Sequence, residues 1–93
     1  MPYHTYILRC ADDSFYVGHC RDLSARAHRH NLATAAKFTA SRRPVILVWH
    51  EDFQDEASAV ARERQIKRWT RRKKEALIAG DLPRLHALAR SRD

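Results

Sequence analysis

Two strand-like segments joined by a very short turn constrain the fold of this chain more than any other feature. Residues 3–10 and 14–20 are rich in aromatic and β-branched side chains, and the turn-forming residues 11–13 separate them. This pattern predicts a β-hairpin. Because side chains alternate between the two faces of a strand, the length of the loop decides which residues share a face.

The loop length therefore determines how Tyr6 and Tyr16 are placed. A two-residue turn at Asp12-Asp13 would put the two phenols on opposite faces of the sheet. A three-residue loop would instead pair Tyr6 with Gly18 and Leu8 with Tyr16, so that both tyrosines lie diagonally on one face. We predict the three-residue loop, with open space at Gly18 opposite Tyr6.

The rest of the chain predicts one more strand and several helices. Asp22, Asp55 and Thr70 are suitable N-caps, Pro44 precedes an apolar run, and Gly80 is a suitable helix end. The expected segments are a helix over 22–31, a strand over 45–49, helices over 55–69 and 70–79, and a short helix over 82–90 with Pro83 in its first turn.

This order of elements, ββαβαα, predicts an α+β fold in which helices flank a small three-stranded antiparallel sheet. Ninety-three residues make one domain. We expect residues 1–80 to form its main body and residues 81–93 to form a C-terminal helical tail of the same domain.

The charge of the chain favours a polyanionic partner. Basic residues outnumber acidic ones 18 to 11, the net charge is +7 and the isoelectric point is about 10.1. The basic residues concentrate at Arg42-Arg43 and over 62–74, which is the pattern expected of a protein that meets a nucleic-acid backbone. Charge alone does not distinguish a nucleic-acid-binding surface from a surface that is basic without binding nucleic acid.

The two cysteines lack the spacing of metal ligands. Cys10 and Cys20 flank the predicted hairpin, and we interpret them as reduced thiols of a cytoplasmic protein. The N-terminus has no apolar segment typical of a secretion signal, and no run of about 20 apolar residues would span a membrane.

A pair of polar residues on the first predicted helix could bind a phosphate. Arg26 and His30 are four residues apart and therefore neighbours on one side of the helix. An arginine can hold a phosphate and a histidine can exchange a proton. Taken alone, such a pair is more often an ordinary solvent-exposed pair without a function.

Glu63 stands out on the second predicted helix because it shares an arc with Ala59, Val60 and Ile66. A carboxylate among apolar neighbours must be paired, protonated or bound to a cation. An ion pair with the neighbouring basic residues and a metal site are equally open. A single carboxylate completed by water and phosphate oxygens suits Mg²⁺.

Several short motifs, in this order and spacing, together resemble the GIY-YIG endonuclease superfamily over roughly residues 3–80, and point to its small stand-alone (YhbQ-like) subgroup. They are Thr5-Tyr6-Ile7, Phe15-Tyr16-Val17-Gly18, the segment 19–31 with Arg26 and His30, Ala36-Lys37-Phe38-Thr39, Arg43-Pro44-Val45, the segment 61–69 with Glu63, and the segment 73–78.

The resemblance implies a nuclease that hydrolyses DNA phosphodiesters with one divalent metal, Mg²⁺ or Mn²⁺, held by Glu63. One of Tyr6 and Tyr16 would help to activate the attacking water while the other positions water or phosphate. Arg26 would stabilise charge on the phosphate, and His30 would assist proton transfer or orient a tyrosine. We expect DNA to contact Lys37, Arg42, Arg43, Lys67, Arg68, Arg71 and Arg72.

The sequence departs from the family pattern in three places: at Thr5, at His19 and Cys20, and at Ala35-Ala36, which replaces a glycine-containing loop. Thr5 stands where the first motif has glycine, His19 where a small residue is common, and Cys20 where threonine is common. We expect His19 and Cys20 to alter the pocket, and Cys20 to add a redox-sensitive thiol near it.

Two other functions stay open beside a DNA endonuclease. One is a non-catalytic module that binds nucleic acid through the basic segment 62–74, and the other is a subunit that needs a protein partner or a second copy. Because no helix-turn-helix or zinc module is visible, we expect single-stranded or structured DNA as substrate, with RNA still open. Phe38, Trp49 and Trp69 could stack on bases, although each is more often a core residue.

Overall fold

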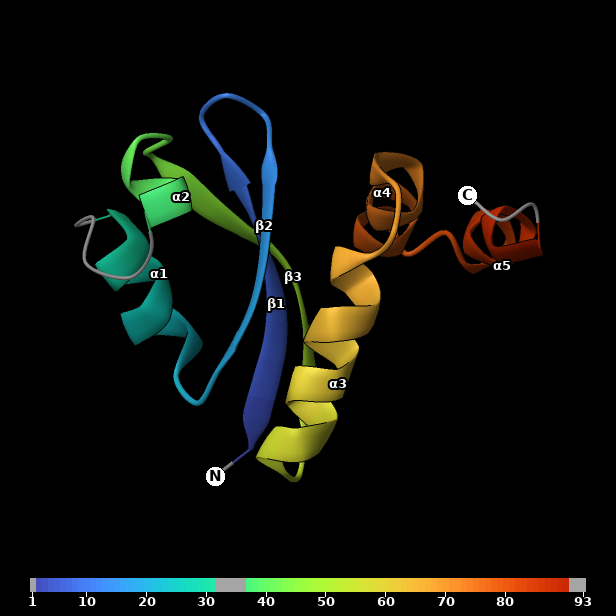
Figure 1. Cartoon of the computed structure of the whole chain (residues 1–93), viewed down its shortest axis with the longest axis horizontal. Helices are drawn as coiled ribbons and strands as arrows, with labels where there is room; N and C mark the ends of the chain where they lie inside the picture. Colours follow the sequence, from blue (N-terminus) through green and yellow to red (C-terminus); the bar gives the residue numbers. More distant parts are fainter. Residues whose placement is uncertain (1, 32–36, 91–93) are drawn as a thin grey trace.

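The computed structural model describes residues 2–31 and 37–90. It contains β1 (Tyr3–Cys10), β2 (Phe15–Cys20), α1 (Leu23–Asn31), α2 (Lys37–Ala40), β3 (Val45–Phe53), α3 (Glu56–Lys67), α4 (Arg71–Ala79) and α5 (Leu82–Arg90) (Figure 1). The strands form one antiparallel sheet in the order β2-β1-β3, which confirms the predicted α+β class. The short helix α2 and the extension of β3 beyond residue 49 were not predicted.

The hairpin has the predicted three-residue loop. The backbone N–H of Cys10 donates to the carbonyl of Ser14 at 2.8 Å, and Asp13 takes up a left-handed conformation with φ of 71°. Tyr6 pairs with Gly18, and Tyr16 lies opposite Leu8. Both phenols therefore lie on the same face of the sheet.

The expectation of open space at Gly18 is wrong, because the Tyr6 ring fills it. A Cβ atom at Gly18 would lie 2.5 Å from the Tyr6 hydroxyl oxygen and 2.7 Å from its Cζ atom. Since real Cβ atoms do not approach other atoms so closely, the missing side chain is what allows Tyr6 to lie across β2.

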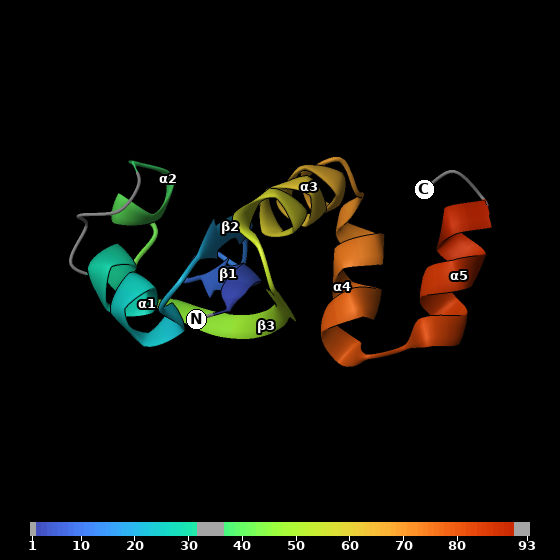
Figure 2. The ribbon, with the colours of Figure 1, turned by 90° about the horizontal axis from the view of Figure 1, so that it is seen from below.

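Helices cover both faces of the sheet, as Figure 2 shows with α1 and α3 on either side of the strands. On one face, Leu23 of α1 packs against a core that includes Tyr6 and Leu8. On the other, Ile66 of α3 packs against a core that includes Ile7. The alternation of residues along β1 thus builds two cores, one on each side.

Thr5 connects the central strand to α3. Its side chain is fully buried, and its hydroxyl donates a hydrogen bond of 2.8 Å to the carbonyl of Ala59. The threonine that replaces the glycine of the family motif therefore fixes the position of the helix that carries Glu63.

The predicted N-caps and the end of α4 are confirmed, whereas α3 ends at Lys67, two residues earlier than predicted. Carboxylate oxygens of Asp22 and Asp55 accept hydrogen bonds from the backbone of Ala25 and Ser58, and Thr70 caps α4. Gly80 ends α4 in the left-handed conformation, with φ of 70°.

The last helix packs beside α4, as Figure 1 shows. Leu88 is buried, and Leu85 packs against the core cluster that contains Ile7 and Ile66. Among the described residues, no helix is long and apolar enough to cross a membrane.

Candidate functional site

Three of the predicted catalytic residues form one cluster on the α1 face of the sheet. Tyr6 and His30 are fully buried, and the Tyr6 hydroxyl oxygen lies 3.1 Å from Nε2 of His30. The centroid of the half-buried Tyr16 ring lies 4.9 Å from that of His30. The two phenols come from β1 and β2, and the imidazole comes from the last turns of α1.

Arg26 lies beside this cluster, where its charge acts to lower the pKa of the Tyr6 phenol. Burial nevertheless keeps the phenol protonated, so its hydroxyl is able to donate to Nε2 of His30. In that arrangement the proton of the neutral imidazole is on Nδ1. Nδ1 of the neutral ring in turn donates to Oγ1 of Thr39, at 2.7 Å.

Burial keeps both Tyr6 and His30 uncharged at neutral pH. Burial and the neighbouring Tyr16 phenol raise the pKa of Tyr6 far above its ordinary value, although Arg26 opposes this. Burial, together with the charges of Arg26 and Arg29, lowers the pKa of His30. A protonated phenol and a neutral imidazole, hydrogen-bonded to each other, are suited to holding a fixed geometry.

Glu63 lies outside this cluster, on the α3 side of the sheet. Its carboxylate is 14% exposed and makes two close contacts, at 2.6 Å with Nδ1 of His19 and at 2.8 Å with Nζ of Lys67. Burial acts to raise the pKa of Glu63, but the hydrogen bonds from Lys67 and His19 bring it below its usual value. Glu63 is thus an ionised carboxylate whose two oxygens are both engaged.

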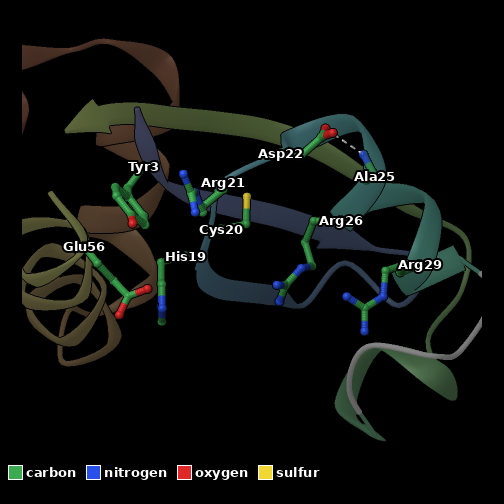
Figure 3. Close-up of a pocket in the computed structure, with 9 residues that line it drawn as sticks. All are labelled: Tyr3, His19, Cys20, Arg21, Asp22, Ala25, Arg26, Arg29 and Glu56. Atoms are coloured by element: carbon green, nitrogen blue, oxygen red, sulfur yellow. Dashed lines mark hydrogen bonds between the residues drawn. The ribbon is translucent and has the colours of Figure 1, made fainter. Parts of the chain in front are cut away.

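The edge strand β2 links the two halves of the site. Gly18 faces Tyr6, and the next residue, His19, points to the opposite face and meets Glu63. Beside this strand lies a cavity of about 350 Å³, lined by Tyr3, His19, Cys20, Arg21, Asp22, Ala25, Arg26, Arg29 and Glu56 (Figure 3). His19 connects the cavity to Glu63, and Arg26 connects it to Tyr6.

The cavity is rich in positive charge. Arg26 and Arg29 extend from α1 in the same direction in Figure 3, and Arg21 comes from the turn between β2 and α1. Such an arrangement of guanidinium groups suits phosphate oxygens. Sequence reasoning missed Arg21, Arg29 and the contact of His19 with Glu63. Helical spacing places Arg29 beside Arg26, and strand alternation places His19 on the face opposite Tyr16.

Several residues predicted to contact DNA are engaged within the protein and lie outside this cavity. The guanidinium of Arg42 pairs with Asp12 at 3.0 Å, and that of Arg43 donates to the carbonyl of Ala40. Arg71 pairs with Asp13 and lies over the ring of Phe15, 4.3 Å from its centroid. Arg42 and Arg71 thus bind the loop of the hairpin, whereas the contact of Arg43 is local.

The remaining basic residues of that group have different surroundings. Lys67 pairs with Glu63, and Arg72 is exposed on α4. Arg68 lines a cavity of about 420 Å³ together with Arg64 and Trp69. The side chains of Lys37 and Phe38 lie outside the described part of the chain.

Trp49 and Trp69 pack against the core on the α3 side of the sheet. The guanidinium of Arg62 lies 6.0 Å from the ring centroid of Trp49 and 5.2 Å from that of Trp69. Both indoles are only partly buried, and Trp69 also lines the cavity with Arg64 and Arg68, so the core and the base-stacking interpretations both stay open.

Comparisons with known proteins show which family the chain resembles. The family model of the GIY-YIG catalytic domain matches residues 2–76. A UPF0213 protein of Staphylococcus aureus is 45% identical over 73 residues, which are 78% of this chain and 89% of the relative.

Two solution NMR structures are also similar. The UPF0213 protein BH0048 from Bacillus halodurans has a TM-score of 0.55 and 37% identity, over 85% of this chain and 84% of that one. The protein EF2693 from E. faecalis has a TM-score of 0.60 and 36% identity, over 86% and 85% of the two chains.

Proposed function

Because the chain belongs to the GIY-YIG family, we propose that it is a metal-dependent endonuclease that hydrolyses phosphodiester bonds of single-stranded or structured DNA. The position of Arg26 carries this proposal. Its guanidinium lines the basic cavity and also lies close enough to the buried phenol of Tyr6 to act on the pKa of that phenol. A phosphate in the cavity would therefore contact an arginine placed beside the two phenols and His30.

The surroundings of each phenol suggest which one activates the attacking water. Tyr6 is fully buried and its pKa is raised, so it stays protonated and is a poor base. Tyr16 is half-buried and lies next to the same cluster. We assign the water-activating role to Tyr16, and to His30 the role of holding Tyr6 in place.

Glu63 is the candidate metal ligand of this chain. A single ionised carboxylate, with water and phosphate oxygens in the other positions, fits Mg²⁺ or Mn²⁺. A bound metal would neutralise charge on the phosphate and lower the pKa of water. The Lys67 ammonium now neutralises Glu63, and since the Lys67 side chain is 51% exposed, it can turn away into solvent.

The substrate preference rests on where the site lies. The cavity follows the open edge of β2, and its phosphate-binding groups come from α1 and the turn before it. The sequence carries no module that reads bases in a duplex groove. Recognition through the backbone and the shape of the DNA is therefore the better match.

The test is cleavage of labelled single-stranded, duplex and branched DNA in Mg²⁺ or Mn²⁺. We expect Glu63→Gln and Arg26→Ala each to lower the rate by about 100-fold or more, as losses of transition-state stabilisation commonly do. Glu75→Gln and Arg84→Ala change exposed residues outside the cavity and serve as matched controls. Equal cleavage by Glu63→Gln and the wild type would contradict the proposal.

One observation favours a second function, a nucleic-acid-binding module without catalysis. Both oxygens of Glu63 are held by His19 and Lys67, which is an arrangement that stabilises the fold without any metal. This function, or a subunit that requires a protein partner, predicts DNA binding that weakens in Arg26→Ala and no cleavage with any metal tested. Metal-dependent cleavage by the purified chain would exclude both.

A further inference from the structure

Three metal-binding side chains meet at the end of the sheet where β1 begins and β3 ends. His4 lies directly opposite Asp52 in the register of the two strands. His50 precedes Asp52 by two residues on β3 and therefore points to the same face. Figure 1 shows the start of β1 and the end of β3 side by side near the N-terminus.

The two imidazoles converge on a single carboxylate oxygen. Nδ1 of His4 lies 2.6 Å from Oδ1 of Asp52, and Nδ1 of His50 lies 3.1 Å from the same atom. One donor atom from each residue falls within 4.8 Å of the other two. The His4 side chain is 14% exposed, whereas His50 and Asp52 are 45% and 55% exposed, so a solvated ion can reach the group.

We propose that His4, His50 and Asp52 bind a divalent transition metal of the zinc class, with water in the fourth position. Zinc bonds to nitrogen and oxygen are about 2.0–2.1 Å long, which places tetrahedral ligand atoms roughly 3.4 Å apart. Each nitrogen–oxygen distance needs to lengthen by less than about 1 Å from its present value. Small rotations of the exposed His50 and Asp52 side chains accomplish this.

The set of donors selects the type of metal. Two imidazoles and one carboxylate suit Zn²⁺, Co²⁺ or Cu²⁺, whereas Mg²⁺ prefers oxygen ligands. Two strands of one sheet supply the ligands, so their backbones are already held at the right separation. Without a metal, hydrogen bonds from the imidazoles to Asp52 keep the three side chains together.

This site is separate from Glu63 and does not depend on the proposed nuclease activity. Residues of β1 alternate in direction, so His4 shares the face of Tyr6, whereas Glu63 contacts His19 on the α3 face. Cys20 pairs with His4 in the strand register but is not among the three residues that converge.

The experiment is a titration of the tag-free 93-residue chain with Zn²⁺ by calorimetry and with Co²⁺ by visible absorption. We expect one Zn²⁺ per chain, no competition by Mg²⁺, and the absorption of four-coordinate Co²⁺ bound through nitrogen and oxygen. His50→Ala and Asp52→Asn should each weaken Zn²⁺ binding at least about tenfold, because even the loss of a group that only supports a ligand commonly costs that much. His86→Ala removes an exposed histidine of α5 and is the matched control.

Two results would overturn the proposal. The first is Zn²⁺ affinity that is equal in the wild type and His50→Ala. The second is a near-ultraviolet sulfur-to-Co²⁺ absorption band, which would place the metal on Cys10 or Cys20. Because His50 and Asp52 are exposed, both variants should keep the circular dichroism spectrum and melting temperature that the metal-free wild type has in EDTA.

Discussion

Among single residues, Gly18 decides where Tyr6 can lie. The phenol of Tyr6 crosses β2 in the space that any other residue at position 18 would fill with its Cβ atom. That path brings the Tyr6 hydroxyl to His30 on α1. Gly18 therefore contributes no chemical group to the site, but it leaves the space that Tyr6 on the neighbouring strand β1 occupies.

Gly18→Ala should destabilise the fold by about 1–3 kcal/mol, because the new methyl group overlaps the Tyr6 phenol. Denaturant unfolding measures the loss. In a Tyr6→Leu background, which removes the overlapping atoms, the same substitution should cost clearly less. Equal costs in the two backgrounds would show that Tyr6 is not the obstacle.

His30 makes stability depend on pH in a direction that can be worked out. Burial lowers the pKa of His30 in the folded protein. Below about pH 6.5, His30 is therefore protonated more readily in the unfolded chain than in the folded one. The stabilisation from neutral His30 is complete above that pH. It is lost as the pH falls from there towards the lowered pKa of the folded state.

Acidification from pH 7 to pH 5 should therefore lower the melting temperature of the wild type more steeply than that of His30→Gln. One buried histidine can contribute a slope of at most about 1.4 kcal/mol per pH unit. Melting curves at intervals of half a pH unit provide the measurement, and His86→Gln at an exposed position is the control. Parallel profiles for the wild type and His30→Gln would contradict this account of His30.

The sequence could predict many of the site residues, because their relative positions depend on contacts between residues that are close in the sequence. The spacing of Arg26 and His30 and the loop between the strands both follow from short-range geometry, and the structure places these groups in one cluster. The two partners of Glu63 could not be chosen in the same way. Lys67 is one of four basic residues near it on the helix, with Arg62, Arg64 and Arg68. The other partner, His19, reaches Glu63 only through the packing of α3 on β2.

Among elements, the contact of β1 with α3 positions the helix that carries Glu63. The Thr5 hydroxyl donates to the carbonyl of Ala59, one helical turn before Glu63. This buried hydrogen bond fixes how far α3 can slide along the sheet, and hence where the Glu63 carboxylate lies.

Thr5→Val keeps the shape of the side chain but removes the donor, and should lower the free energy of unfolding by about 1 kcal/mol. Urea denaturation measures the change. Thr5→Ser keeps the hydroxyl and should retain the hydrogen bond. Any decrease in its free energy of unfolding should therefore come only from the missing methyl group. Full stability in Thr5→Val would show that the hydrogen bond contributes nothing.

The differences between predicted and observed elements have physical causes. Residues 50–53 are mainly polar and charged, which weakens the strand signal, yet β3 continues through them because β1 pairs with them. Tertiary pairing thus overrides local preference. The four-residue helix α2 is too short to leave a periodic pattern in the sequence.

At the scale of the whole molecule, the net charge is +7, and several of the positive side chains line the cavity beside β2. Positive charges near a phosphate chain release its bound counterions, so binding becomes salt-dependent. The fold brings Arg21, Arg26 and Arg29 to one place, although the richest basic segment of the sequence lies elsewhere.

Arg29→Ala should weaken DNA binding at low salt and reduce the slope of log K against log[salt] by about 0.7–0.9, the value of one lost phosphate contact. Fluorescence anisotropy over a series of salt concentrations measures both the affinity at low salt and the slope. Arg84→Ala, which removes an equal charge outside the cavity, should leave the slope unchanged. A similar decrease in both variants would mean that only the total charge matters.

The sequence predicted the fold class but not the order of the strands. Two segments and a short turn specify the β1–β2 pair, since that pairing is local. The third strand could add to either side of the hairpin, and the choice depends on the long-range contacts that place β3 beside β1. That choice is what leaves β2 at the edge, beside the cavity.

The position of β2 at the edge has a consequence for solubility. Among the described residues, no strand pairs with its outer side, and an open edge is a template on which another chain can add a strand. His19, Arg21 and the guanidinium groups of α1 surround that edge. An approaching copy would bring the same positive charges with it, so the groups that attract phosphate also protect the protein against aggregation through β2.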